Sequence, residues 1–294
     1  MMSTASLTTR IKDYGTLMKP RITLLALVTT FVGFWIAGTA FSSFTLMFTL
    51  IGTALGSSSA STLNNYVDRE LDQKMSRTRE RSLPSGRIEP NRALVFGILL
   101  GIGGCSVMAL FVNPLSAGLL LFTILFYIFV YTIWLKRHSP YSTEIGGIAG
   151  SMPPVIGWAA ATGSLGLEAL TLFMIMFIWQ PPHFWALGIY YLDDYKDADI
   201  PRFPVVKGID ATKWRTLLYN VILLPASVIP YTLDMVGTTY LVAASVTGLA
   251  YLAITIQFVL KPITRSAALK LFSFSNLYLL LLFIFMFVSS RSFY

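Results

Sequence analysis

An acidic cluster in this 294-residue chain has the residue types and the spacing to hold a metal ion. Asn64, Asp68 and Asp72 follow one another at intervals of four residues. On a continuous helix this spacing places three oxygen-bearing side chains on one face, about one turn apart. That face is a candidate ligand set for a divalent cation.

A second acidic cluster lies further along the chain. Asp193 and Asp197 are again four residues apart, with Asp194 between them. Close carboxylates repel one another, and a divalent cation relieves that repulsion. The two clusters do not form an all-protein cage, and they therefore suit Mg²⁺, which keeps water and takes further oxygens from a bound phosphate. Either cluster alone is equally typical of a solvated helix end, but the two together favour a metal–diphosphate site.

Basic residues accompany the clusters, and we predict that they bind phosphate oxygens. Arginine suits this role as a bidentate clamp and lysine as a compact charge. The candidates are Arg21, Lys74, Arg77, Arg81, Lys136 and Arg137. For Lys136 and Arg137, ordinary charge on the cytoplasmic side is an equal alternative. The predicted catalytic carboxylates are Asp68, Asp72 and Asp194.

The elements that must position these clusters are membrane spans. Apolar residues make up 55% of the chain and charged residues only 12%, about half the charge of an ordinary soluble domain. Nine runs of 18 to 24 residues carry no Asp, Glu, Lys or Arg, and each is about long enough to cross ~30 Å of hydrocarbon as a helix. The runs are 22–41, 43–63, 93–112, 115–135, 145–163, 169–192, 216–233, 237–260 and 271–290. We predict one all-α polytopic membrane domain over residues 1–294, with nine transmembrane helices and no cleaved signal peptide.

The basic residues give this domain an orientation. All 22 Lys and Arg residues except Arg291 fall on one side of the predicted spans. By the positive-inside rule, that side and the N-terminus are cytoplasmic, and nine spans place the C-terminus opposite. The net charge of +8 therefore orients the protein and does not indicate a nucleic-acid partner. The long cytoplasmic connections 64–92 and 193–215 carry the acidic clusters and are predicted to be the catalytic loops.

His183 lies inside the sixth predicted span, where an ionisable residue is a functional candidate. The alternative is a histidine that hydrogen-bonds a neighbouring helix. Pro153–Pro154 and Pro181–Pro182 interrupt the fifth and sixth spans, where such breaks line a cavity or kink the helices. Trp179 and Trp185, near the second break, are candidates to line that cavity.

At these residues the sequence resembles the UbiA-type intramembrane prenyltransferases. That family carries an Asn-x-x-x-Asp-x-x-x-Asp motif, as at Asn64–Asp72, and a second acidic motif, as at Asp194. The segments Trp179–His183 and Ile200–Val206 make the chain similar to the heme-modifying branch of the family. The resemblance covers most of the chain and implies the UbiA-type fold, with its helices around a central cavity.

The resemblance also implies an activity. The farnesyl group of farnesyl diphosphate would be transferred to a vinyl group of heme b, with addition of water, giving heme O and diphosphate. Mg²⁺ would be the cofactor, and His183, Trp179 and Trp185 would contact the heme substrate. A bacterial plasma (inner) membrane would be the location, and heme A synthase or terminal oxidase assembly the candidate partners. The chain departs from the family pattern at Ser82, where proline is usual, and at Glu144, where an aliphatic residue is expected.

Two other functions stay open at this point. A UbiA-type enzyme that prenylates an aromatic acid such as 4-hydroxybenzoate would share the acidic motifs but would not need His183. A transporter of anionic substrates would use the acidic clusters for ion coupling. Against the transporter, the acids lie at membrane ends and the sequence shows no inverted repeat.

Overall fold

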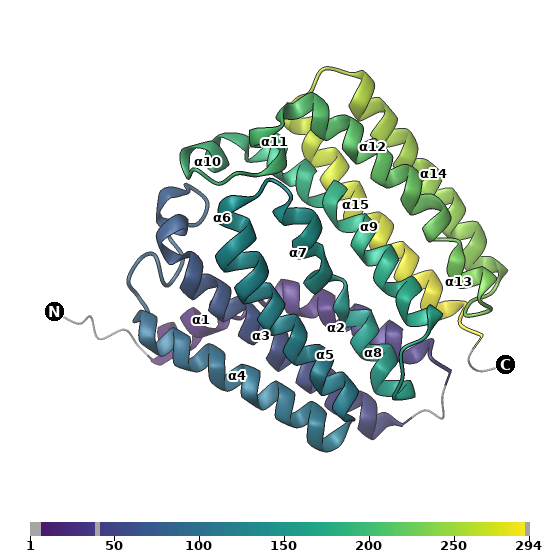
Figure 1. Ribbon diagram of the computed structural model, residues 1–294, viewed down its shortest axis with the longest axis horizontal. Coiled ribbons are helices and arrows are strands. Elements are labelled where there is room, and N and C mark those ends of the chain that lie inside the picture. The colour runs from purple at the N-terminus through teal and green to yellow at the C-terminus, as the bar shows by residue number, and fades with distance from the viewer. Residues whose placement is uncertain (1–6, 39–41, 292–294) are drawn as a thin grey trace.

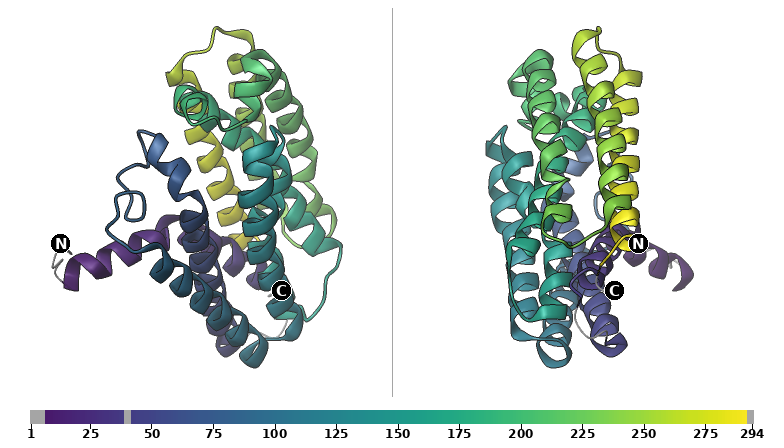
Figure 2. Two further views of the ribbon diagram at one scale, coloured as in Figure 1. Left: turned by 60° about the vertical axis from the view of Figure 1, so that its left-hand side comes forward. Right: turned by 90° about the vertical axis from the view of Figure 1, so that its right-hand side faces the viewer.

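The computed structural model describes residues 7–38 and 42–291, and these residues are mostly helical, as predicted (Figure 1). Long helices lie side by side in a common direction (Figure 2). The longer helices are α2 (Pro20–Trp35), α3 (Ser43–Lys74), α4 (Pro90–Phe111), α9 (Leu167–Tyr190), α12 (Gly208–Ala226), α14 (Thr238–Leu260) and α15 (Arg265–Val288). The shorter ones are α1 (Leu7–Leu17), α5 (Pro114–Leu125), the π-helix η1 (Phe126–Leu135), α6 (Lys136–His138), α7 (Ser142–Gly150), α8 (Met152–Thr162), α10 (Leu192–Asp197), α11 (Phe203–Val206) and α13 (Ile229–Thr232).

Several of these helices are long and apolar enough to cross a membrane, so the chain is a multi-pass membrane protein. Within the described residues there are six: Ser43–Lys74, Pro90–Phe111, Pro114–His138, Leu167–Tyr190, Thr238–Leu260 and Arg265–Val288. A seventh is obtained if Thr9–Leu17 and Pro20–Trp35, which meet at 49°, form one span.

Nine spans are not confirmed, because three of the predicted runs do not form single long helices within the described residues. The fifth predicted span, 145–163, divides at Ser151 into the two short helices α7 and α8. The seventh predicted span, 216–233, does not coincide with α12. That helix begins earlier, at Gly208 in a charged segment, and ends at Ala226. The first, 22–41, ends in residues 39–41, which lie outside the described residues.

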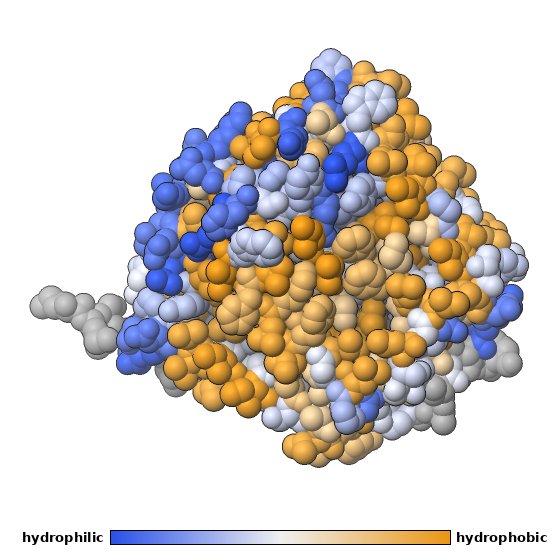
Figure 3. All heavy atoms as spheres, viewed as in Figure 1, coloured by the Kyte–Doolittle hydropathy of each residue, from blue (hydrophilic) through white to orange (hydrophobic). Residues whose placement is uncertain are grey.

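Surface hydropathy agrees with a membrane position. Hydrophilic residues gather over α10, α6 and the segment between α3 and α4, at the upper left of the molecule (Figures 1 and 3). A smaller hydrophilic patch lies at the lower right, near α13 (Figure 3). A wide hydrophobic band separates the two, as expected where lipid surrounds a protein. Both acidic clusters belong to the elements at the upper left.

The helix α3, which carries the first acidic cluster, is held closely against α4. Ser59 Oγ donates a hydrogen bond of 2.7 Å to the carbonyl of Gly97. A Cβ atom at Gly104 would lie 2.9 Å from the carbonyl oxygen of Gly52. Small residues let two helices approach in this way inside a membrane.

The helices α2 and α8 approach even more closely. Thr30 Oγ1 donates to the carbonyl of Pro153 at 3.0 Å. A Cβ atom at Gly157 would lie 2.0 Å from the carbonyl oxygen of Thr30, and one at Gly33 would lie 2.1 Å from that of Pro154. Since no heavy atoms sit this close without bonding, only glycine fits at both positions.

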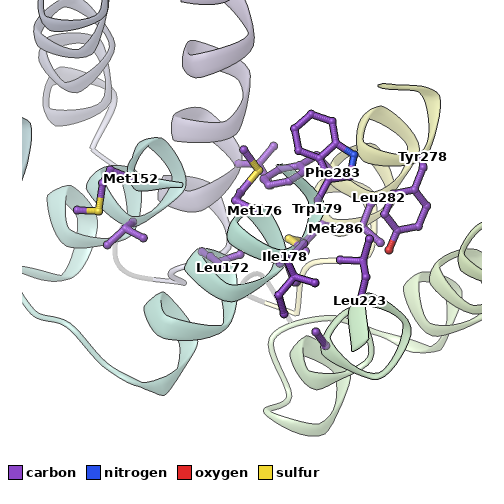
Figure 4. Packing of buried hydrophobic residues seen from close by; sticks show 14 of the residues in the cluster. Met152, Leu172, Met176, Ile178, Trp179, Leu223, Tyr278, Leu282, Phe283 and Met286 are labelled. Carbon is purple, nitrogen blue, oxygen red and sulfur yellow. The ribbon is translucent and has the colours of Figure 1, made fainter. Parts of the chain in front are cut away.

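The C-terminal half has its own core, built around α9. Trp179 of α9 lies beside Phe283 of α15, and Leu223 of α12 approaches from the other side (Figure 4). Trp179 Nε1 donates to the carbonyl of Ser275 at 2.8 Å, so the indole is also hydrogen-bonded across the interface. This packing holds α9 in a fixed position next to α15 and α12.

The α2–α8 contact predicts a stability difference between two glycines. We expect Gly157→Ala to lower the free energy of unfolding by about 1–3 kcal/mol, because the added methyl group must push the helices apart. Gly118→Ala on α5 is the matched control, since Gly118 is exposed and has nothing within 4 Å of an added Cβ. Thermal unfolding in detergent measures both. Equal midpoints for the two variants would contradict the close contact.

Candidate functional site

The first acidic cluster lies on the last turns of α3, as its spacing predicts. Asn64, Asp68 and Asp72 are only 5%, 2% and 4% exposed. Asn64 Nδ2 donates to Asp68 Oδ2 at 2.7 Å, which confirms that the two side chains share one helix face. Carboxylates are rarely this buried without a charged partner.

Two predicted phosphate-binding residues supply that partner. Lys136 Nζ lies 2.5 Å from Asp68 Oδ2, and Arg81 Nη1 lies 2.8 Å from Asp72 Oδ2. Lys136 comes from the start of α6, and Arg81 from the segment between α3 and α4. The structure therefore brings the acidic and basic residues of the predicted site together.

Lys19 adds a third cation to the group. It precedes α2, outside the membrane-spanning helix, and its Nζ donates to Asn64 Oδ1 at 2.7 Å. Burial, followed by the charges of Arg81 and Lys136, lowers the pKa of Lys19 to about 7. An anion bound here would offset the charges of Arg81 and Lys136 and so favour the protonated form of Lys19.

One oxygen of the cluster fits a metal ion. Asp68 Oδ1 is buried and has no hydrogen-bond partner among the described residues, whereas Oδ2 of the same carboxylate accepts from Lys136 and Asn64. Over residues 7–38 and 42–291, no three His, Cys, Asp or Glu side chains gather into a metal-binding group. A cation at Asp68 would therefore take only some of its oxygens from carboxylates, as Mg²⁺ does when it binds a phosphate.

The second acidic cluster, on α10, is only partly joined to the first. Asp194 accepts a hydrogen bond of 2.8 Å from Ser76, just after α3. Asp193 is exposed and pairs with Arg265 of α15 at 2.6 Å. Asp197 is exposed and makes no side-chain ion pair with the described residues. Of the three aspartates, Asp194 is thus the one tied to the end of α3.

The other basic candidates lie at the rim of the site. The guanidinium of Arg77 lies 4.9 Å from the ring of Tyr191, between α9 and α10. Arg137 Nη2 donates to the carbonyl of Val67 at 2.9 Å. Two further candidates are exposed and form no ion pair with any described residue: Arg21 and Lys74.

The π-helix η1 brings further polar groups to the cluster. Thr132 accepts from Asn64 Nδ2 at 3.3 Å, and Lys136 follows directly after η1. Tyr131 OH accepts from Arg202 Nη2 at 3.1 Å. Such π-helical segments are frequent at functional sites because they shift side chains out of the usual helical register.

Both departures from the expected sequence pattern have partners in the structure. Ser82 Oγ donates to Asp13 Oδ1 of α1 at 2.8 Å. This bond holds the segment that presents the neighbouring Arg81. Glu144 is 6% exposed, and its Oε1 lies 3.3 Å from Arg215 Nε of α12. Each unexpected side chain therefore joins two elements next to the site.

The three candidate heme contacts do not lie together. His183 Nδ1 is 2.7 Å from Ser275 Oγ of α15, and its ring stacks on Trp179 with the centroids 4.5 Å apart. Trp185 contacts α11 and α12 instead, with its ring centroid 5.4 Å from that of Phe203. The structure thus places His183 and Trp179 against α15, and Trp185 on another side of α9.

Comparison with known proteins identifies the family. The model of the UbiA prenyltransferase family matches residues 26–289. This chain belongs to the UbiA prenyltransferase family. Relatives named protoheme IX farnesyltransferase include one from Rickettsia akari, 43% identical over 96% of this chain and 92% of the relative. Another, from Aquifex aeolicus, is 44% identical over 93% of each chain.

Solved structures show the UbiA fold in distant proteins. A chain from work on digeranylgeranylglyceryl phosphate synthase in membranes superposes with a TM-score of 0.80, at 18% identity, over 96% of this chain and 98% of that one. A UbiA homologue from Archaeoglobus fulgidus bound to GPP and Mg²⁺ gives a TM-score of 0.62 at 16% identity, over 93% and 99%.

Two basic side chains that contact the acidic cluster or η1 are not among the residues predicted from the sequence: Lys19 and Arg202. Each is a charged residue next to a proline, Pro20 and Pro201 respectively. Lys19 also has a left-handed backbone, with φ of 49°. A basic residue beside a proline at a membrane end is the only sequence signal for either one, and the same pattern is typical of ordinary connections.

Because Asp68 Oδ1 has no hydrogen-bond partner among the described residues, we predict that two acidic residues of α3 differ in their effect on metal binding. We expect Asp68→Asn to weaken Mn²⁺ binding, measured by titration with inorganic pyrophosphate present, by at least about tenfold. The control is Glu70→Gln, because Glu70 is exposed and pairs with the adjacent Arg69 at 3.0 Å. A loss of the same size in both variants, or in neither, would contradict a metal site at Asp68.

Proposed function

We propose that this UbiA-family protein transfers the farnesyl group of farnesyl diphosphate to a vinyl group of heme b, with addition of water, to give heme O and diphosphate. The observation that carries the proposal is the buried face of Asn64, Asp68 and Asp72, opposed by Arg81 and Lys136. Relatives named protoheme IX farnesyltransferase, at 43 and 44% identity over most of both chains, support the choice of substrates.

In the proposed enzyme the acidic residues hold Mg²⁺. Asn64, Asp68 and Asp72 supply oxygens from α3, and Asp194 supplies them from α10. When bound by these residues, Mg²⁺ would supply Lewis-acid stabilisation of the charge on the departing diphosphate. The acidic set is completed by Asp193 and Asp197. A UbiA homologue bound to GPP and Mg²⁺ supports this choice of ion.

The basic residues bind the diphosphate. Arg81 and Lys136 now neutralise Asp72 and Asp68, and with the substrate bound they donate to phosphate oxygens as well. Their hydrogen bonds strengthen as the bridging oxygen gains charge, which lowers the barrier to leaving. Lys19 belongs to the same group through Asn64. The remaining residues proposed to bind the diphosphate are Arg21, Lys74, Arg77 and Arg137.

The carbon chemistry needs no covalent bond to the protein. The bond between farnesyl C1 and oxygen breaks, and its electron pair leaves with the diphosphate. The π electrons of the heme vinyl group then form a bond to the allylic cation. Water adds to the new cation beside the porphyrin ring and loses a proton, which yields the hydroxyl group. A dry interior protects the first cation from early capture by water.

We also propose that more helices cross the membrane than the six or seven candidate spans. We place α2, the broken pair α7–α8 and α12 across the bilayer as well, which makes nine spans around a central cavity. The N-terminus is cytoplasmic and the C-terminus lies opposite, because the basic residues cluster at the site end. The membrane is a bacterial plasma membrane, where heme A synthase or terminal oxidase assembly would take up heme O.

The direct test is an incubation with purified protein. With heme b, farnesyl diphosphate and Mg²⁺, we expect heme O by mass spectrometry, and no prenylated product from 4-hydroxybenzoate. Asp72→Ala should abolish turnover, because a metal oxygen is lost and Arg81 is left unpaired. Glu80→Ala, an exposed residue of the same segment, should retain activity. Prenylation of 4-hydroxybenzoate without heme O, or transport without chemistry, would overturn the proposal.

His183 gives a separate prediction. We expect His183→Ala to weaken heme b binding more than farnesyl diphosphate binding, measured by titration for each ligand. Ser275→Ala is the matched control, because it removes the 2.7 Å contact to His183 without removing the imidazole. Equal losses for both ligands, or the same loss in both variants, would mean that His183 only joins α9 to α15.

A further inference from the structure

Arg202 is held in place by hydroxyl groups and aromatic rings. Its guanidinium donates to Tyr131 OH at 3.1 Å and to Thr143 Oγ1 at 3.3 Å, and it lies 5.4 Å from the ring centre of Tyr195. Among residues 7–38 and 42–291, no carboxylate lies within ion-pair distance of it. A half-buried guanidinium held only by neutral groups has lost water contacts without gaining a counter-ion.

A donor that does lack an acceptor lies on the same small cavity as Arg202. Arg202, Trp185, Tyr195 and Thr143 all line this cavity. Trp185 is 1% exposed, and its Nε1 is buried with no hydrogen-bond partner among the described residues. Buried indole N–H groups normally have an acceptor. One anionic oxygen in this cavity would supply both the missing acceptor of the indole N–H and a counter-ion for Arg202.

The cavity lies beside the proposed diphosphate site. Arg202 bonds to Tyr131 of η1, and Lys136 at the end of η1 bonds to Asp68. The diphosphate already has Arg81, Lys136 and Lys19 as donors, grouped around the carboxylates of α3. The walls around Arg202 are aromatic and include Phe184, which is 46% exposed. The cavity has a volume of about 20 Å³, which admits a small acid group, and the exposed Phe184 offers a ring against which a flat, apolar molecule carrying that acid can lie.

We propose that Arg202 and Trp185 Nε1 bind a carboxylate of the acceptor, a heme propionate, and so orient the porphyrin toward the allylic carbon. This assignment rests on the proposed function, because it names the part of heme b that the site recognises. The planar guanidinium matches a carboxylate in a two-point contact, which lysine cannot reproduce. Trp185 thereby has a role through its N–H group that is independent of His183.

The test compares two acceptors in binding and in turnover. Heme b and its dimethyl ester differ only in whether the propionates are charged. For the wild-type protein we expect the ester to bind about 10- to 100-fold more weakly in a Soret titration, as for the loss of a charged hydrogen-bonded contact. For Arg202→Met we expect heme b to bind as weakly as the ester does, with KM for farnesyl diphosphate unchanged.

Further variants separate the roles. Arg202→Lys keeps the charge but loses the planar two-point contact, and its heme affinity should lie between those of the wild type and Arg202→Met. Trp185→Phe should weaken heme b binding and leave ester binding unchanged. Lys207→Met, an exposed residue just after α11, is the control and should match the wild type.

Several results would overturn the assignment. One is that Arg202→Met still binds the dimethyl ester more weakly than heme b, by the same factor as the wild type does. Another is a raised KM for farnesyl diphosphate in that variant, which would make Arg202 a diphosphate residue. Equal binding of heme b and ester by the wild type would also refute it, whether or not Arg202→Met folds. Wild-type protein that binds heme b through its propionates but forms no heme O would instead contradict the proposed function alone.

Discussion

Two buried carboxylates at the end of α3 are the constraint on which the rest of the structure depends. A chain with only 12% charged residues places Asp68 and Asp72 at 2% and 4% exposure, where an unpaired charge is very costly. Lys136 and Arg81 offset that cost by direct ion pairs. The pairs are nevertheless incomplete, because Asp68 Oδ1 has no hydrogen-bond partner among the described residues. An incomplete buried network of this kind is expected where a metal and an anion complete it.

The surrounding elements hold this network from several directions. Ser59 and the glycines of α4 fix α3 in place, and the span Pro114–His138, which contains η1, brings Lys136 to the site. The bond from Ser82 to Asp13 docks α1 against the segment that carries Arg81. Because these contacts come from α1, α4, η1 and the segment between α3 and α4, the site forms only when these elements pack around α3. Single helices of this protein would carry the residues without the geometry.

Much of this arrangement could be predicted from residue patterns. The four-residue spacing of Asn64, Asp68 and Asp72 specifies one helix face, and α3 does continue through Lys74. Hydropathy predicts where apolar helices lie, and Pro153–Pro154 indicate an interruption of the run 145–163, but neither shows that the break falls at Ser151. Charge counting also cannot show which basic residue contacts which acid. That choice depends on the fold, and so Lys19 and Arg202 were indistinguishable from ordinary cytoplasmic charge.

The central claim is that the face of α3 binds a metal–diphosphate pair. The most direct measurement is an experimental structure with Mg²⁺ and a non-reactive thio analogue of farnesyl diphosphate. We predict Mg²⁺ at about 2.1 Å from Asp68 Oδ1, with Arg81 and Lys136 donating to phosphate oxygens. A metal and diphosphate bound elsewhere, with Asp68 Oδ1 still without a partner and both ion pairs unchanged, would contradict the account.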